Sequence, residues 1–254
     1  MDIGLDNFYR DLKGIPNQGI LDASATQKYP LGTRYAKNDG RVFRYAKAGA
    51  VALVAGNLIQ SAALGGADTT VQHDLTPAAA AAGSYTVTVT LKTTAQAKDT
   101  FKNGWLAVTD GDAANAMGDL YLIKSHPAAS GGAACVITLY EPLKRAITTN
   151  SRISLLANIY SGVIQAPATT PTGLAVGVAP TAVPANNYFW LQTWGIANVL
   201  IQTATTAGVR VQRDVGAAGA VGKTANTILT EIVGMCGYVN DTTDAGFVFL
   251  TIAP

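Results

Sequence analysis

Short segments with a period of two residues fill most of the chain after Tyr29, and this period is the one that a β-strand imposes. The segment 84–91 alternates most regularly, with large apolar residues facing small hydroxyl residues. Helix signals are confined to Asp2–Lys13, which Gly14 and Pro16 end. The spacing therefore predicts a mainly β protein made of two small domains, each resembling a β-sandwich or a β-barrel. Further strands are expected at 105–108, 120–124, 135–140, 153–160, 188–193, 198–202, 208–212, 228–238 and 246–252.

A change of composition suggests where the domains divide. Residues 166–184 contain four prolines and no charge, which is typical of a linker with one short strand in it. We therefore expect an N-terminal arm at 1–28, a β domain at 29–164 and a C-terminal β domain at 165–254. The arm shows no partner of its own in the sequence, and such arms often lie on another subunit.

Residues 29–49 form a basic and aromatic β-hairpin whose turn is expected at Asn38-Asp39-Gly40. Neither face of its second strand is purely apolar or purely polar, so both faces could meet a partner. The alternative is an edge hairpin that is simply solvated. The candidate contact residues are Arg34, Arg41, Phe43, Arg44, Tyr45 and Lys47.

Charge is scarce in the rest of the molecule. Charged residues make up 13% of the chain and hydrophobic residues 48%, so much of the surface must be neutral, which suits coverage by neighbouring subunits. The net charge of +2 is too small to predict direct binding of nucleic acid. The longest apolar stretch, Ala48–Leu58, is too short to predict a membrane span, and the first eleven residues lack the apolar core of a secretory signal.

Motifs that would carry chemistry are incomplete. The loop 216–224 resembles a phosphate-binding loop but has Ala217 where the first glycine is required. His73 and His126 stand apart from each other and from any metal-binding pattern. We therefore predict no catalytic residue, no cofactor and no metal.

The aspartates and the two cysteines each have two competing interpretations. The aspartates Asp110, Asp112 and Asp119 partly resemble a calcium loop, but a polar turn is expected. Cys135 and Cys236 lie in apolar runs typical of buried, reduced thiols, and a disulfide between them is the alternative.

An aromatic strand at 187–195 would place Tyr188, Trp190 and Trp194 on one face. Aromatic side chains beside an amide are used by carbohydrate-binding surfaces. They also fill small β cores and protein interfaces, and this is the interpretation we prefer for these three residues.

The hairpin YPLGTRYAKNDGRVFRYAKAG and the small residues that follow it to Gln60 resemble the N-terminal part of structural proteins of tailed bacteriophages. The order from Pro184 to Gln192, then a glycine turn, a Gly-Val strand and Ile232-Val233-Gly234, is similar to capsid decoration (cement) proteins. The middle region 66–159 departs from the smallest members as an insertion.

The resemblance implies a non-catalytic virion protein that is made in the host cytoplasm and lies on the capsid exterior. Its expected partners are the major capsid protein and itself, as a homo-oligomer, with a trimer expected. The alternative is a receptor- or glycan-binding module of a phage tail or capsid spike that uses Tyr188, Trp190 and Trp194.

Overall fold

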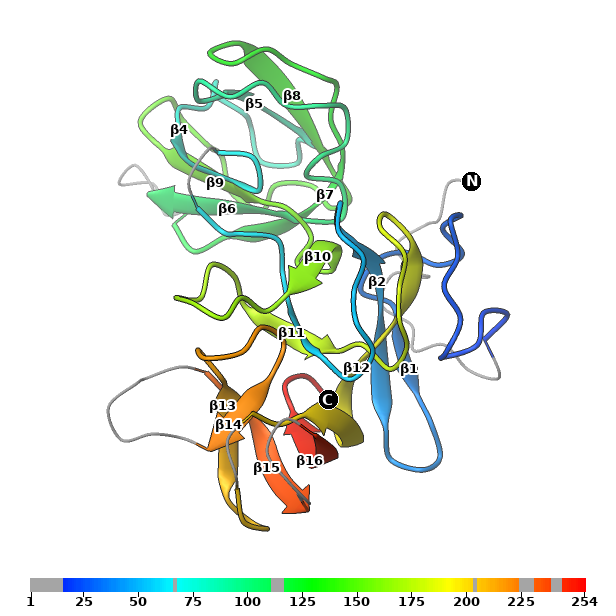
Figure 1. Ribbon diagram of the computed structural model, residues 1–254. Coiled ribbons are helices and arrows are strands. Elements are labelled where there is room, and N and C mark those ends of the chain that lie inside the picture. Colours follow the sequence, from blue (N-terminus) through cyan, green and yellow to red (C-terminus); the bar gives the residue numbers. More distant parts are fainter. Residues whose placement is uncertain (1–15, 66–67, 111–116, 203–204, 224–230, 239–243) are drawn as a thin grey trace. The chain divides into compact units, whose positions relative to one another are not determined.

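The computed structural model describes residues 16–254 except 66–67, 111–116, 203–204, 224–230 and 239–243, and this part of the chain contains strands and no helix (Figure 1). The mainly β fold class is thus confirmed. The strands are β1 (Arg34–Ala36), β2 (Val42–Ala48), β3 (Leu58–Gln60), β4 (Val71–Leu75), β5 (Thr86–Thr90), β6 (Trp105–Asp110), β7 (Leu120–Ser125), β8 (Ala134–Leu139), β9 (Arg152–Leu156), β10 (Ser161–Gln165), β11 (Ala175–Val178), β12 (Tyr188–Leu200), β13 (Arg210–Arg213), β14 (Val221–Lys223), β15 (Ile232–Tyr238) and β16 (Ala245–Thr251).

The chain divides into two compact units, but not at the expected boundary. One unit, the inserted unit, is Ala63–Asn158; the other, the split unit, combines the residues up to Ala62 with Ile159–Pro254. The expected boundary at 164 is wrong because it falls inside β10, which pairs with both β2 and β3. The inserted unit nearly coincides with the middle region 66–159, which was expected as an insertion on the basis of the resemblance.

A closed ring of five strands forms one half of the split unit. β2 pairs with β10, β10 with β3, β3 with β11, β11 with β12, and β12 again with β2. The proline-rich segment 166–184, expected as a linker, supplies β11 to this barrel. Every strand of the ring contributes to one buried cluster, so these side chains fill the barrel interior. The cluster includes Ala46, Ala48, Ile59, Val163, Val176, Phe189 and Leu191.

Strand β12 is long enough to serve two sheets. Its first part pairs with β2, and its second part pairs with β16, from which the sheet continues through β15 and β13 to β14 (Figure 1). The expected strands 188–193 and 198–202 are therefore one strand, and the expected turn at Gly195 is wrong. Gly195 has φ +83°, and a Cβ there would lie 3.0 Å from the carbonyl oxygen of Gly40. Glycine thus lets the strand pass close to the hairpin without a clash.

The inserted unit is a six-stranded sheet in the order β4-β9-β6-β7-β8-β5. The sheet curls so far that Pro77, just after β4, bridges to Val89 on the opposite edge strand β5. The alternation expected at 84–91 is confirmed over β5, where Val87 and Val89 are buried and Thr86 and Thr90 are exposed, but Tyr85, expected on the same face as the valines, is 54% exposed. This unit has its own hydrophobic core, as an independently folding domain requires.

Candidate interaction surface

The end of the expected arm packs on its own unit. Gln18 donates from Nε2 to the carbonyl oxygen of Tyr188 (2.9 Å) and accepts the hydroxyl of Tyr45 (2.7 Å). Its backbone oxygen accepts the indole N–H of Trp190 (2.9 Å). The expectation of an arm without a partner in its own subunit is therefore wrong for residues 16–28, because Gln18 satisfies polar groups that would otherwise be buried and unpaired. The expected helix at 2–13 lies outside the described residues.

Three aromatic residues expected at an interface lie inside the protein. Phe43, Tyr45 and Trp190 are 0% exposed, and the rings of Tyr45 and Trp190 are 5.0 Å apart in an edge-to-face arrangement. Ile20, Tyr29, Leu31, Tyr35 and Tyr188 pack around them. We call this set the aromatic cluster. Phe43 and Tyr45 cannot touch a partner, and Trp190 cannot stack on a sugar, because residues 16–31 cover them.

Burial also changes the acidity of Tyr45. Removal of its hydroxyl from water raises the pKa of Tyr45 to about 12, against an ordinary value of 10.0. The hydroxyl accepts the backbone N–H of Lys28 (3.1 Å) as well as donating to Gln18. The neutral phenol is thus part of the packing between the segment 16–31 and the barrel.

The hairpin forms as expected, and its loop carries an ion pair. Arg34 lies opposite Arg44 in the register of β1 and β2, and Gly40 has φ +84° in the turn. Arg41 binds Asp39 at 2.7 Å, with side chains 31% and 43% exposed respectively. This guanidinium holds the pKa of the Asp39 carboxyl well below its usual range.

The other hairpin cations are half-buried and partly engaged. Arg44 donates to the carbonyl oxygen of Gly32 (3.3 Å) and to an oxygen of Pro254 (3.1 Å). Lys47 lies over the ring of Tyr188 at 5.5 Å from its centroid. Of the six candidate contact residues, the four cations Arg34, Arg41, Arg44 and Lys47 are all partly exposed, so each keeps part of its side chain at the surface.

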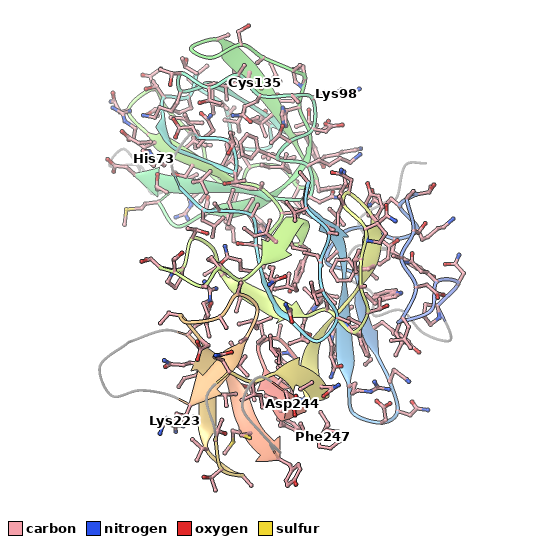
Figure 2. The ribbon with its side chains drawn as sticks, in the orientation of Figure 1. His73, Lys98, Cys135, Lys223, Asp244 and Phe247 are labelled. Atoms are coloured by element: carbon pink, nitrogen blue, oxygen red, sulfur yellow. The ribbon has the colours of Figure 1, made fainter. Side chains whose placement is uncertain are left out.

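A second surface was missed by the sequence analysis. Large apolar side chains lie on the solvent side of β12, β16 and β15, and Figure 2 shows Phe247 projecting outward from β16. Ile196, Phe249 and Met235 form one row across the three strands in register. We call this surface the outer face. Its exposed apolar residues are Ile196 (50%), Ile232 (50%), Met235 (46%), Tyr238 (58%), Phe247 (55%) and Phe249 (38%).

The opposite side of the same sheet is a packed core. Val199, Val248 and Leu250 are 0% exposed there. Strand β16 is therefore apolar on both sides, AGFVFLT, with one side buried and one side open. In the sequence, the outer face is visible only as a strand that is apolar on both sides. Such a strand is normally interpreted as fully buried.

A shallow hollow of about 380 Å³ connects the outer face with the hairpin loop. Its lining combines an ion pair, an amide and apolar side chains. The lining residues are Asp39, Arg41, Ile196, Ala197, Asn198 and Phe247. The hairpin loop and the outer face thus belong to one continuous surface of the split unit.

The residues with potential for chemistry are occupied by structural contacts. His126 is 2% exposed, accepts the backbone N–H of Phe101 at Nε2 (3.0 Å), and has Nδ1 2.8 Å from the carbonyl oxygen of Pro127. Cys135 and Cys236 are buried free thiols, so that expectation is confirmed. Burial raises the pKa of the Cys135 thiol. Figure 2 labels His73 on β4, a solvent-exposed position of the inserted unit.

Asp119 and Glu231 are likewise occupied by structural contacts. Asp119 pairs with Arg145 and accepts the hydroxyl of Tyr121 (2.8 Å), whereas Asp112 lies outside the described residues. Glu231 pairs with the buried Arg213 at 2.8 Å. Among the described residues, no three His, Cys, Asp or Glu side chains gather in a way that could hold a metal ion. Val221–Lys223, within the loop that resembles a phosphate-binding loop, is strand β14.

Comparisons with known protein families, with curated proteins and with solved structures found no match for this chain. In the part of the chain that the structure describes, no helix is both long and apolar enough to cross a membrane. The function is therefore inferred from the residues and their arrangement.

Proposed function

We propose that this protein is a non-catalytic virion protein, a capsid decoration protein that binds the outside of the coat lattice as a homo-oligomer and stabilises the capsid. One observation carries the proposal: the split unit presents an apolar outer face beside a charged hairpin loop, in a chain with only 13% charged residues. Surfaces of this kind bind proteins. The class of partner, a phage coat, comes from the resemblance of the hairpin and of the second strand series to cement proteins.

The basic hairpin is the proposed contact with the coat. Arg34, Arg41 and Lys47 are among its partly exposed cations, and they would pair with acidic groups on the coat. Arg41 would have to leave Asp39 in order to bind an acidic group of the coat. This costs little, because an ion pair as exposed as Arg41–Asp39 contributes about 0–1 kcal/mol. Many copies with modest contacts then hold the lattice through effective concentration.

The competing function, glycan or receptor binding through Tyr188, Trp190 and Trp194, has less support. Trp190 is fully buried, and Trp194 packs edge-to-face on Phe249 with ring centroids 5.7 Å apart. The three rings therefore do not form one open platform. A stacking surface for sugars requires exposed ring faces.

The copy number of the protein in purified particles tests the proposal most directly. Quantitative mass spectrometry of phage particles from the lysate that contains this chain should give a copy number of the same order as the coat protein. A handful of copies per particle would indicate a tail or spike module. Absence from the particles would refute a virion role.

A charge-reversal pair tests the hairpin. Arg34→Glu with Arg41→Glu should lower capsid occupancy, because both substitutions place negative charge against an acidic coat surface. Arg44 is left unchanged because it bonds within the fold. Lys98→Glu with Lys102→Glu is the matched control, since both lysines are exposed on the inserted unit. Full occupancy with the hairpin pair would remove the hairpin from the coat contact.

A further inference from the structure

The outer face is as large as the largest apolar patches found on isolated subunits. At about 200 Å² for a fully accessible side chain of this size, its six apolar residues expose roughly 600 Å². Patches on monomeric proteins reach about 300–600 Å² at most, and larger ones mark interaction sites. A standard interface buries about 800 Å² on each partner. The outer face alone supplies most of that area.

The chemistry of the outer face fits a second copy of the same chain. The described residues that point to solvent from β12, β16 and β15 on this face include no charged side chain. When two identical faces pack together, each charged side chain can lie near a side chain of the same charge and repel it. A face without charged side chains avoids this repulsion. Homo-oligomer interfaces are also more apolar than interfaces between proteins that exist apart.

Charged groups lie at the margins of the face instead. Arg210 lies in register with Met235 at the β13 side. Asp39 and Arg41 line the hollow at the β12 side. An apolar centre with a polar rim is the usual anatomy of a stable protein interface.

We propose that the outer face, formed by Ile196, Met235, Phe247 and Phe249 with their neighbours Ile232 and Tyr238, is the surface through which copies of this chain bind one another. This inference rests on the proposed function, which requires an oligomer, and it assigns the oligomer contact to the apolar face that the hairpin loop borders. A decoration protein exists free before it meets the coat. Covering this face in the oligomer keeps such a weakly charged chain soluble until then.

Sedimentation velocity of the full chain between about 1 and 100 μM tests the proposal. The wild type should sediment as a multiple of the 26.2 kDa chain. Phe247→Glu and, separately, Met235→Glu should raise the dissociation constant on the order of 100-fold, because each places a charge within the apolar contact. Val51→Glu is the matched control: Val51 is apolar and 71% exposed in the same unit, but it lies outside the outer face.

Two measurements keep the outcomes distinct. Far-ultraviolet circular dichroism should be the same for all variants, since both substituted side chains are about half exposed. A monomeric wild type, or Phe247→Glu and Met235→Glu proteins that associate like the wild type, would overturn the proposal. A monomeric wild type whose Phe247→Glu variant loses capsid occupancy would instead make the outer face a coat contact. An oligomer that depends on this face but does not occupy capsids would support the proposal and refute the decoration function alone.

Discussion

The two ends of strand β12 carry similar side chains and have opposite surroundings. Near its start, Trp190 is 0% exposed under the segment 16–31. Near its end, Ile196 is 50% exposed beside Phe249, and none of the described residues covers them to the same degree. The two ends differ because the segment 16–31 supplies apolar contacts and hydrogen-bond partners to the first end, while no described segment does so for the second.

This contrast shows that aromatic content alone does not mark a binding surface. The covered end has the stronger aromatic sequence signal, yet it is interior because Gln18 accepts the Trp190 indole and the Tyr45 hydroxyl. The open end has the weaker signal, and its residues are the ones available to a partner. Burial by the chain's own segment decides between core and interface.

The largest expected effect is at the covered end. Trp190→Ala should lower the free energy of unfolding of the split unit by about 3–5 kcal/mol, because it empties a fully enclosed site and leaves the Gln18 oxygen without its donor. Urea denaturation followed by circular dichroism measures the change. Trp194→Ala, at a half-buried site on the same strand, is the control and should cost clearly less. Equal costs would contradict the contrast.

Alkaline pH should loosen the same cluster. The Tyr45 phenol ionises near pH 10 in the unfolded chain but has a pKa of about 12 in the fold, so its contribution is complete below pH 10 and is lost as the pH rises through 12. The stability advantage of the wild type over Tyr45→Phe should therefore fall by about 2 kcal/mol between these values. Chemical denaturation at both pH values measures it. A constant difference would mean that the hydroxyl is hydrated.

The glycine between the two ends provides an intermediate test. Gly195→Ala should cost about 1–2 kcal/mol, because φ +83° strains an alanine and its Cβ would lie 3.0 Å from the Gly40 oxygen. Thermal unfolding measures the loss. Gly208→Ala is the control for φ alone, since φ is +80° there and no atom lies within 4 Å of the added Cβ. Equal losses would show that the close approach to the hairpin is unimportant.

The smallest effect on the subunit's own stability should come from the open end. Phe247→Thr, at a side chain 55% exposed, should change the free energy of unfolding of the dilute protein by less than about 0.5 kcal/mol. Threonine preserves the strand preference of the position. Urea denaturation at low protein concentration is the measurement. A loss as large as that of Trp190→Ala would mean that Phe247 is a core residue.

The sequence predicted what depends on neighbouring residues. The alternation over Thr86–Thr90 and the Asn38-Asp39-Gly40 turn are local patterns, and both are confirmed. Barrel closure was not predictable, because β2 and β12 lie more than a hundred residues apart and no local pattern pairs them. The hydrogen bond from Trp190 to Gln18 spans 172 residues, so the burial of Trp190 under the expected arm was not predictable either.

The interaction surface was the least predictable part. The strand Ala245–Thr251 is apolar on both sides, and a strand of this kind is normally interpreted as buried on both. Only the three-dimensional structure shows that Val248 and Leu250 lie on a core while Phe247 and Phe249 face solvent. Phe43 and Tyr45 illustrate the reverse error, since their place in a basic hairpin suggested a contact while the segment 16–31 encloses them.

Hydroxyl-radical footprinting across protein concentration tests the contrast most directly, because it reads both ends of β12 and its neighbours in one sample. Trp190 and Tyr45 should remain unmodified at every concentration. Met235, Phe247 and Phe249 should be modified in dilute protein and become protected as the concentration rises and copies associate. Modification of Trp190, or modification of Met235 and Phe247 that does not change with concentration, would contradict the account.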